Sequence, residues 1–211
     1  MPLYDLKPRF RAVLMVLVPA LQSVHPDRIT FAALACSILA AALFHWAEAH
    51  RFLFLVIPVL LFLRIMCNAL DGLVAQATGT ARAFGEVLNE GTDRLSDVAI
   101  LLGLACSPLS SLRWGAPAVT AVLLSSYVGI LGKAVGAGRQ YGGVLGKADR
   151  MLYLVVACVI AFFAGNPTFT HVRGLPIRLF DALLFLFTAL AAVTALQRVL
   201  AIHRSLGGRR S

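Results

Sequence analysis

Six long apolar stretches run through this 211-residue chain and decide what it can fold into. A helix needs about 20 mostly apolar residues to cross a bilayer, and each stretch meets or approaches that length. Hydrophobic residues make up 59% of the chain and charged residues only 14%, which excludes an ordinary soluble domain and a disordered chain. The stretches cover residues 29–47, 52–77, 85–106, 114–135, 151–165 and 179–202.

These stretches predict an all-α integral membrane protein with six transmembrane helices. The residues before them mix charged side chains with Tyr4, Phe10 and Leu14, which predicts an N-terminal interfacial amphipathic helix with those three side chains toward lipid. No repeat and no long linker divides the chain. We therefore expect one domain over residues 1–211, with an interfacial helix (1–26), a six-helix bundle (27–205) and a basic tail (206–211).

The distribution of basic residues predicts the orientation in the membrane. Lys and Arg outnumber Asp and Glu by 19 to 10, for a net charge of +9. In a membrane protein such an excess marks the cytoplasmic side, so we expect no nucleic-acid partner. Six spans that start in the cytoplasm leave few basic residues outside, which predicts two cytoplasmic termini in a bacterial-type inner membrane. The outside residues are Arg51, Arg113, Arg173 and Arg178.

Half of the ten carboxylates gather where the second apolar stretch ends and the third begins. A charge at the centre of a spanning helix costs about 2.5 to 3.5 kcal/mol on insertion scales, so these acids need a reason to be there. Two asparagines lie among them. The acids are Asp71, Glu86, Glu90, Asp93 and Asp97, and the amides are Asn68 and Asn89.

Helical spacing places these side chains on two stripes. Asn68 and Asp71 share one face of the second stretch, while Asn89, Asp93 and Asp97 recur every four residues on the third. Two helices joined by a short loop would bring the stripes together. Oxygen ligands gathered in a low-dielectric site favour a hard divalent cation, and we expect Mg²⁺ or Mn²⁺.

Two other interpretations of the acids remain open. They could pair with Arg64, Arg82 and Arg94 in a buried network that only fixes helix packing. They could also line the pathway of an ion-coupled transporter. Pathway acids are usually spread through the membrane depth, whereas these gather near the cytoplasmic ends of two helices. That position favours a site that water-soluble metal and nucleotide can reach.

The same residues carry a family resemblance. A motif in this chain resembles the CDP-alcohol phosphotransferase signature, which reads D-x-x-D-G-x-x-A-R, eight residues, then G-x-x-x-D-x-x-x-D. Here the motif reads Asn68-x-x-Asp71-Gly72-x-x-Ala75-Gln76, eight residues, then Gly85-x-x-x-Asn89-x-x-x-Asp93. Every spacing matches. Asn68 and Asn89 replace aspartates of the signature, and Gln76 replaces its arginine. Pro26 and Thr30 are similar to the family's P-N-x-L-T segment.

The resemblance implies an enzyme that transfers a phosphatidyl group to the hydroxyl of a polar acceptor and releases CMP. The donor would be CDP-diacylglycerol (CDP-DAG) or another CDP-alcohol, and Asp93 would act as general base. The asparagines also leave open a relative that binds CDP-lipid or metal without turnover. The metal ligands would be Asn68, Asp71, Asn89, Asp93 and Asp97, and the residues around the nucleotide would be Thr30, Gly72, Ala75, Gln76 and Gly85.

Further partners follow from the membrane setting and from the resemblance. We expect membrane lipids around the helices, and a homodimer because family members commonly form one through their spanning helices. Arg139, Lys147 and Arg150 belong to a glycine-containing segment before the fifth stretch. They could hold a phosphorylated acceptor or the donor phosphates, or only mark the cytoplasmic side. Arg64 could pair with Asp71 or face the acceptor.

Overall fold

Six long helices account for most of the computed structural model, which describes residues 10–172 and 174–207. Each helix coincides with one predicted apolar stretch to within a few residues. The helices are α3 (Pro26–Ala47), α4 (Leu53–Ala77), α5 (Ala83–Ala105), α6 (Leu112–Ala134), α7 (Lys147–Ala164) and α8 (Leu179–Gly207).

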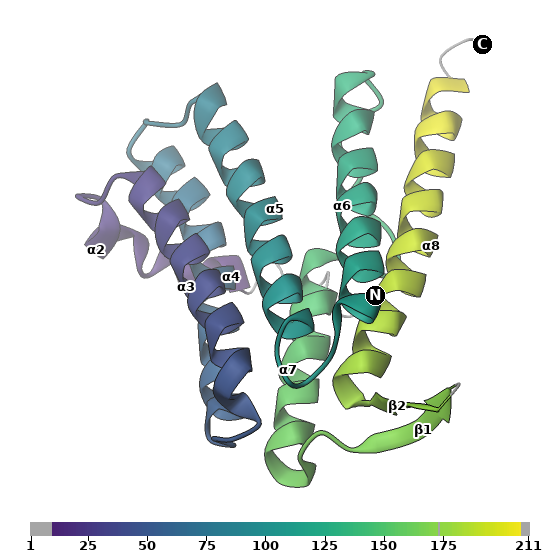
Figure 1. The fold of residues 1–211 in the computed structure, drawn as a ribbon. Coiled ribbons are helices and arrows are strands. Elements are labelled where there is room, and N and C mark those ends of the chain that lie inside the picture. The colour runs from purple at the N-terminus through teal and green to yellow at the C-terminus, as the bar shows by residue number, and fades with distance from the viewer. Residues whose placement is uncertain (1–9, 173, 208–211) are drawn as a thin grey trace.

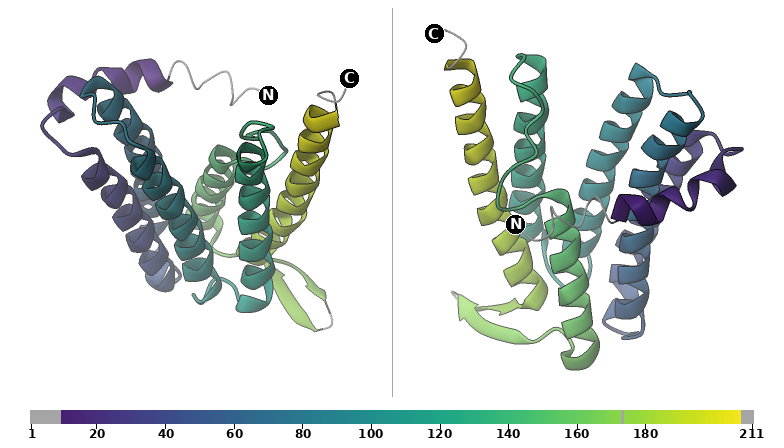
Figure 2. Two further views of the ribbon diagram at one scale, coloured as in Figure 1. Left: turned by 90° about the horizontal axis from the view of Figure 1, so that it is seen from above. Right: turned by 180° about the vertical axis from the view of Figure 1, so that it is seen from behind.

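The long helices form two groups. Helix α3 packs along α4 and α5, and α6 packs along α8, while contacts of α5 with α6 and of α4 with α7 join the groups. Figure 1 shows the groups diverging toward the end of the molecule where α8 finishes. Figure 2 shows the same divergence from behind. The connections from α4 to α5 and from α6 to α7 also lie at this end.

Small residues allow α5 to approach its neighbours closely. A Cβ atom added at Gly103 would lie 2.6 Å from the Cβ of Ala41 on α3. One added at Gly115 would lie 2.1 Å from the Cβ of Ala105, where α6 begins beside the end of α5. Close backbone approach through small residues is typical of helices that pack within membranes.

Large apolar side chains lie both inside and outside the bundle. Phe54 and Phe180 stack in the interior with ring centroids 5.9 Å apart. On the exterior, Phe62, Phe163 and Phe185 each expose more than half of their surface. An exterior with this many exposed aromatic and aliphatic side chains is matched to lipid.

Within the described residues, four helices are long and apolar enough to cross a membrane, namely α3, α4, α6 and α8. The other two long helices carry concentrated charge. Helix α5 holds four of the clustered acids, and α7 begins with Lys147, Asp149 and Arg150. Six spans therefore remain a prediction, while six long helices in one bundle are observed.

The N-terminal region differs from the single helix predicted for it. Residues 10–15 are helical, a turn follows, and α2 (Val18–Leu21) is a separate short helix. The expectation that Leu14 faces lipid is wrong, because Leu14 is buried with Val18 against the side chains of Leu70 and Val74 on α4. Phe10 packs edge-to-face on Phe62, and Tyr4 lies outside the described residues.

A β-hairpin that the sequence analysis does not predict connects α7 to α8. Strand β1 (Thr168–Val172) pairs antiparallel with β2 (Leu175–Arg178), and Gly174 turns the chain with a φ of +79°. The Asp181 carboxylate accepts hydrogen bonds from the Ser110 hydroxyl at 2.6 Å and the Arg178 amide at 3.0 Å. These bonds fix the hairpin at the opposite end from the connection between α4 and α5 (Figure 1).

Candidate functional site

The end of α4 and the start of α5 bring the two predicted stripes into direct contact. The Asn89 amide on α5 donates to Oδ2 of Asp71 on α4 at 2.7 Å. In the reverse direction, the Asn68 amide on α4 donates to Oδ1 of Asp93 on α5. Each helix thus supplies one amide and one carboxylate, and each amide reaches the carboxylate of the other helix. The four side chains form a single polar cluster.

Asp71 is the one carboxylate of the predicted stripes without a basic partner in the described part of the chain. Its side chain is buried, with 3% of the residue exposed. Besides Asn89, it accepts hydrogen bonds from the Thr30 hydroxyl at 2.6 Å and from the Gly72 amide at 2.6 Å. These donors are neutral, and no described basic side chain lies within ion-pair distance of the Asp71 carboxylate. A cation bound beside Asp71 would therefore not compete with a neighbouring arginine or lysine for this carboxylate.

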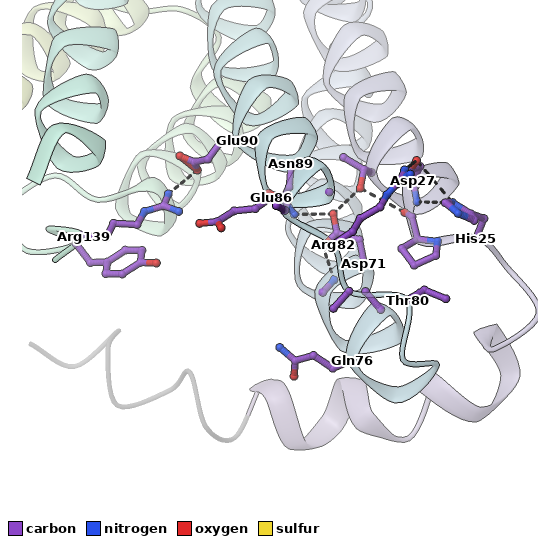
Figure 3. Close-up of a pocket in the computed structure, with 18 residues that line it drawn as sticks. His25, Asp27, Asp71, Gln76, Thr80, Arg82, Glu86, Asn89, Glu90 and Arg139 are labelled. Atoms are coloured by element: carbon purple, nitrogen blue, oxygen red, sulfur yellow. Dashed lines mark hydrogen bonds and ion pairs between the residues drawn. The ribbon is translucent and has the colours of Figure 1, made fainter. Parts of the chain in front are cut away.

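A cavity of about 600 Å³ opens beside Asp71. Figure 3 shows the Asp71 and Asn89 side chains together at its wall, with Arg139 and Glu90 on another side. A Cβ added to Gly72 would meet no atom within 4 Å, so this part of the wall has room for a ligand. The predicted site residues that line the cavity are Thr30, Asp71, Gly72, Ala75, Gln76, Gly85 and Asn89.

Asp97 belongs to a different cluster from Asp71, because arginines occupy the carboxylate that the sequence predicts as a metal ligand. Its Oδ1 accepts from Arg64 at 2.8 Å, and its Oδ2 accepts from Arg150 at 2.6 Å. Arg94 lies 3.6 Å from the same Oδ2. Only 1% of Asp97 is exposed, and both oxygens are occupied by guanidinium groups. The residue therefore fixes α5 to α4 and α7.

The other acids also find basic partners. Glu86 pairs with Lys133, Glu90 with Arg139, and Asp93 Oδ1 with the Lys147 ammonium at 2.5 Å. From the sequence, only Arg64, Arg82 and Arg94 were considered as partners of these acids. The structure brings further cations from α6, from α7 and from the segment between them. Ion pairs therefore account for Asp97, Asp93, Glu90 and the exposed Glu86, but not for Asp71.

Arg64 lies in a buried ion pair of the kind considered for the clustered acids, whereas Arg82 lies at the cavity. Arg64 is fully buried and pairs with Asp97, so it neither pairs with Asp71 nor faces the cavity. Arg82 lines the cavity and pairs with Asp27 at the start of α3. This pair connects the segment between α4 and α5 to α3 at the cavity wall (Figure 3).

Arg139, which the sequence left open as a phosphate-binding residue, lies at the cavity together with Tyr141, which the sequence did not single out. Arg139 stacks over the Tyr141 ring, 4.8 Å from its centroid, and both residues line the cavity. Burial by itself would lower the pKa of Arg139, but the hydrogen bond and charge of Glu90 outweigh burial and raise the pKa. A glycine-containing segment indicates a mobile connection, and nothing in its spacing shows that it folds back onto α6. The contact of Arg11 with Gln76 was also missed.

The donor set around Asp71 is chemically suited to one divalent cation. Asp71 supplies an uncompensated carboxylate, and the carbonyl oxygens of Asn68 and Asn89 can act as ligands when their amide groups rotate. Asp93 completes a set of four oxygen-bearing side chains from two adjacent helices. The two carboxylates of this set, Asp71 and Asp93, carry too little negative charge for two divalent cations, because Asp93 already neutralises Lys147. The residues therefore fit a single Mg²⁺ or Mn²⁺.

Known proteins are similar to this chain in sequence over about 70% of its length. No protein-family model matches the chain. It is 36% identical over 154 residues to the inner membrane protein YnbA of Escherichia coli, covering 72% of this chain and 76% of YnbA. It is 33% identical over 156 residues to a phosphatidylinositol phosphate synthase of Cutibacterium acnes, covering 70% of this chain and 72% of that enzyme. The chain belongs to the CDP-alcohol phosphatidyltransferase family.

Solved structures show the same fold. Mycobacterium tuberculosis phosphatidylinositol phosphate synthase PgsA1 with CDP-DAG bound aligns with a TM-score of 0.70 at 20% identity, covering 90% of this chain and 94% of that one. The same enzyme with manganese and citrate gives a TM-score of 0.67 at 20% identity, covering 92% and 88%. The family is metal-dependent and acts in phospholipid biosynthesis. This member is an integral membrane protein.

Proposed function

We propose that this CDP-alcohol phosphatidyltransferase transfers the phosphatidyl group of CDP-DAG, or the substituted phosphoryl group of another CDP-alcohol, to a polar acceptor and releases CMP. Membership of the family and the buried, unpaired Asp71 carboxylate beside a cavity support the proposal. The chain would act as one domain with six spans, in a bacterial-type inner membrane, with its N-terminal segment at the interface. Both termini would lie in the cytoplasm.

The cavity suits the nucleotide part of the donor. It lies at the end of the bundle, where the helix groups diverge, so a cytidine diphosphate could stay in water while the acyl chains remain among apolar side chains. Gly72 and Ala75 give the wall little bulk, and Thr30, Gln76 and Gly85 continue it. The volume of about 600 Å³ lies within the range of ligand pockets.

Asn68, Asp71, Asn89 and Asp93 would hold the divalent cation. When bound, that cation would neutralise the charge that develops on the departing CMP. Thr30 and Gly72 keep the Asp71 carboxylate oriented by donating to its two oxygens. The asparagines at the two motif positions lower the negative charge of the site without removing oxygen ligands, so one cation is proposed rather than two.

Asp93 is the proposed general base. Its carboxylate lies one helical turn beyond Asn89, which lines the cavity, and would take the proton from the acceptor hydroxyl as that oxygen attacks phosphorus. Asn68 and Lys147 both donate to Oδ1 of Asp93. Its Oδ2 lies 3.7 Å from Arg94, beyond hydrogen-bond distance, and is the oxygen left for the acceptor proton.

The charges behind Asp93 favour an acceptor that carries an anionic group. In the described region, five cations meet only three carboxylates, which leaves surplus positive charge where the acceptor would lie. A phosphorylated polyol would compensate that surplus, and a neutral alcohol would not. The relatives named phosphatidylinositol phosphate synthases agree with this choice. The cations are Arg64, Arg94, Arg139, Lys147 and Arg150, and the carboxylates are Glu90, Asp93 and Asp97.

An acceptor screen tests the proposal. The purified chain, reconstituted with CDP-DAG and Mn²⁺, should release CMP with inositol phosphate or glycerol phosphate and much less with inositol, glycerol or serine. Asp93→Asn should abolish the release. Glu48→Gln is the matched control, because Glu48 pairs with Arg178 at the opposite end of the bundle. Full activity of Asp93→Asn would reject the assigned base, and no CMP with any acceptor would reject the enzyme.

A further inference from the structure

One arginine reaches the edge of the cavity from the N-terminal segment, residues 10–21. The Arg11 guanidinium donates to Oε1 of Gln76 at 3.1 Å, and Gln76 lines the cavity. In the described part of the chain this neutral amide is the hydrogen-bond partner of Arg11. The charge of Arg11, which is exposed, is therefore not offset by a described carboxylate.

The cations that line the cavity are already paired. Arg82 pairs with Asp27, and Arg139 pairs with Glu90. The lining also includes Asp71 and Glu86, so carboxylates outnumber cations on the cavity wall. The diphosphate of a nucleotide-linked lipid is strongly anionic, and the single divalent cation proposed at Asp71 would offset only part of the negative charge of the diphosphate and the wall. The diphosphate needs positive charge that is not already bound to an acid.

The N-terminal segment is held beside the cavity by its packing on α4. Leu14 and Val18 are buried against α4, which fixes the segment beside the cavity. On its other side, Val13 and Val16 are 67% and 77% exposed, which suits contact with lipid. Figure 3 shows the segment passing close to Gln76. Arg11 thus lies between the apolar surroundings and the polar cavity.

We propose that Arg11 binds the diphosphate of the CDP-linked donor, so that the N-terminal segment forms part of the donor site. The inference rests on the proposed function for the identity of the donor. An arginine presents a planar set of donors that matches phosphate oxygens, and Gln76 orients it toward the cavity before the donor arrives. Arg11 is a specificity residue for the anionic donor and takes no part in proton transfer.

The test compares Arg11→Ala and Arg11→Lys with Arg28→Ala. Arg28 is the matched control, because it is exposed at the start of α3 and does not line the cavity. The full-length protein is placed in nanodiscs of phosphatidylcholine. CMP release gives kcat and KM for CDP-DAG, and calorimetry gives the Kd for water-soluble CDP.

Arg11→Ala should raise both KM and Kd about tenfold, which is the loss expected for one charge-assisted hydrogen bond, with kcat nearly unchanged. Arg11→Lys should give KM and Kd values between those of the wild type and of Arg11→Ala.

Three results would overturn the inference. The first is an unchanged KM and Kd in Arg11→Ala. The second is a raised KM for CDP-DAG with an unchanged Kd for CDP, which would assign Arg11 to anionic lipid headgroups in general. The third is an equal effect of Arg28→Ala. A wild-type protein that binds CDP through Arg11 and releases no CMP would refute the proposed function and leave this inference standing.

Discussion

Removal of the Asp97 carboxylate should destabilise the protein strongly, because it leaves two buried guanidinium groups without a counterion. Arg64 is 0% exposed and Arg150 is 3% exposed, and each donates to one oxygen of Asp97. Removing one partner of a buried ion pair typically costs about 3 to 5 kcal/mol. We expect a loss of this size for Asp97→Asn, which keeps the shape of the side chain and removes its charge.

The matched control is Glu86→Gln, which breaks an ion pair that is exposed to solvent rather than buried. Glu86 and Lys133 each expose 54% of their side chains. Exposed ion pairs contribute about 0 to 1 kcal/mol, so the free energy of unfolding should change little. Unfolding of both variants can be followed by circular dichroism in mixed micelles with increasing dodecyl sulfate.

The same experiment separates a structural Asp97 from a metal-binding one. Folded Asp97→Asn, kept below its unfolding midpoint, should bind Mn²⁺ with the affinity of the wild type. An Asp97→Asn variant with wild-type stability and no Mn²⁺ binding would refute the reasoning. That result would make Asp97 a metal ligand and would show that Arg64 does not depend on Asp97 for its counterion.

Three further predictions concern glycines and the cation. Gly72→Ala should stabilise α4 by up to about 1 kcal/mol, since its Cβ meets open space, yet weaken CDP binding, because that space is the cavity. Gly91→Ala, equally open on α5 but outside the cavity, should stabilise without changing the Kd for CDP. Gly103→Ala should lower the melting temperature, at a cost of about 1 to 3 kcal/mol, because its Cβ would lie 2.7 Å from the Cα of Ala41. Calorimetry should find one Mn²⁺ per chain, and two would show that the ligand set is incomplete.

Local sequence signals predicted most of the fold. Each long helix follows from an apolar stretch bounded by polar, Gly or Pro residues, and those signals lie within the stretch itself. The contact between the two stripes was also predictable, because α4 and α5 are adjacent in the sequence and their polar residues recur at helical spacing. The reciprocal pairing of Asn68 with Asp93 and of Asn89 with Asp71 follows from that adjacency.

The failures involve partners that are distant in the sequence. Arg150, 53 residues away, was not recognised from the sequence as a counterion of Asp97. Leu14 was assigned to lipid because an amphipathic pattern does not show whether its apolar face meets lipid or another helix. The hairpin between α7 and α8 rests on the hydrogen bonds of Asp181, and its short strands carry no strong alternating pattern.

The most direct test of the account is the coupling between CDP and Mn²⁺ at Asp71. Calorimetry of the wild-type protein should show that saturating Mn²⁺ tightens CDP binding at least about tenfold, and CDP should tighten Mn²⁺ by the same factor. Asp71→Asn should abolish this coupling while the helical circular dichroism spectrum is retained. Equal CDP affinity with and without Mn²⁺, or full coupling in Asp71→Asn, would contradict a shared cation and nucleotide site.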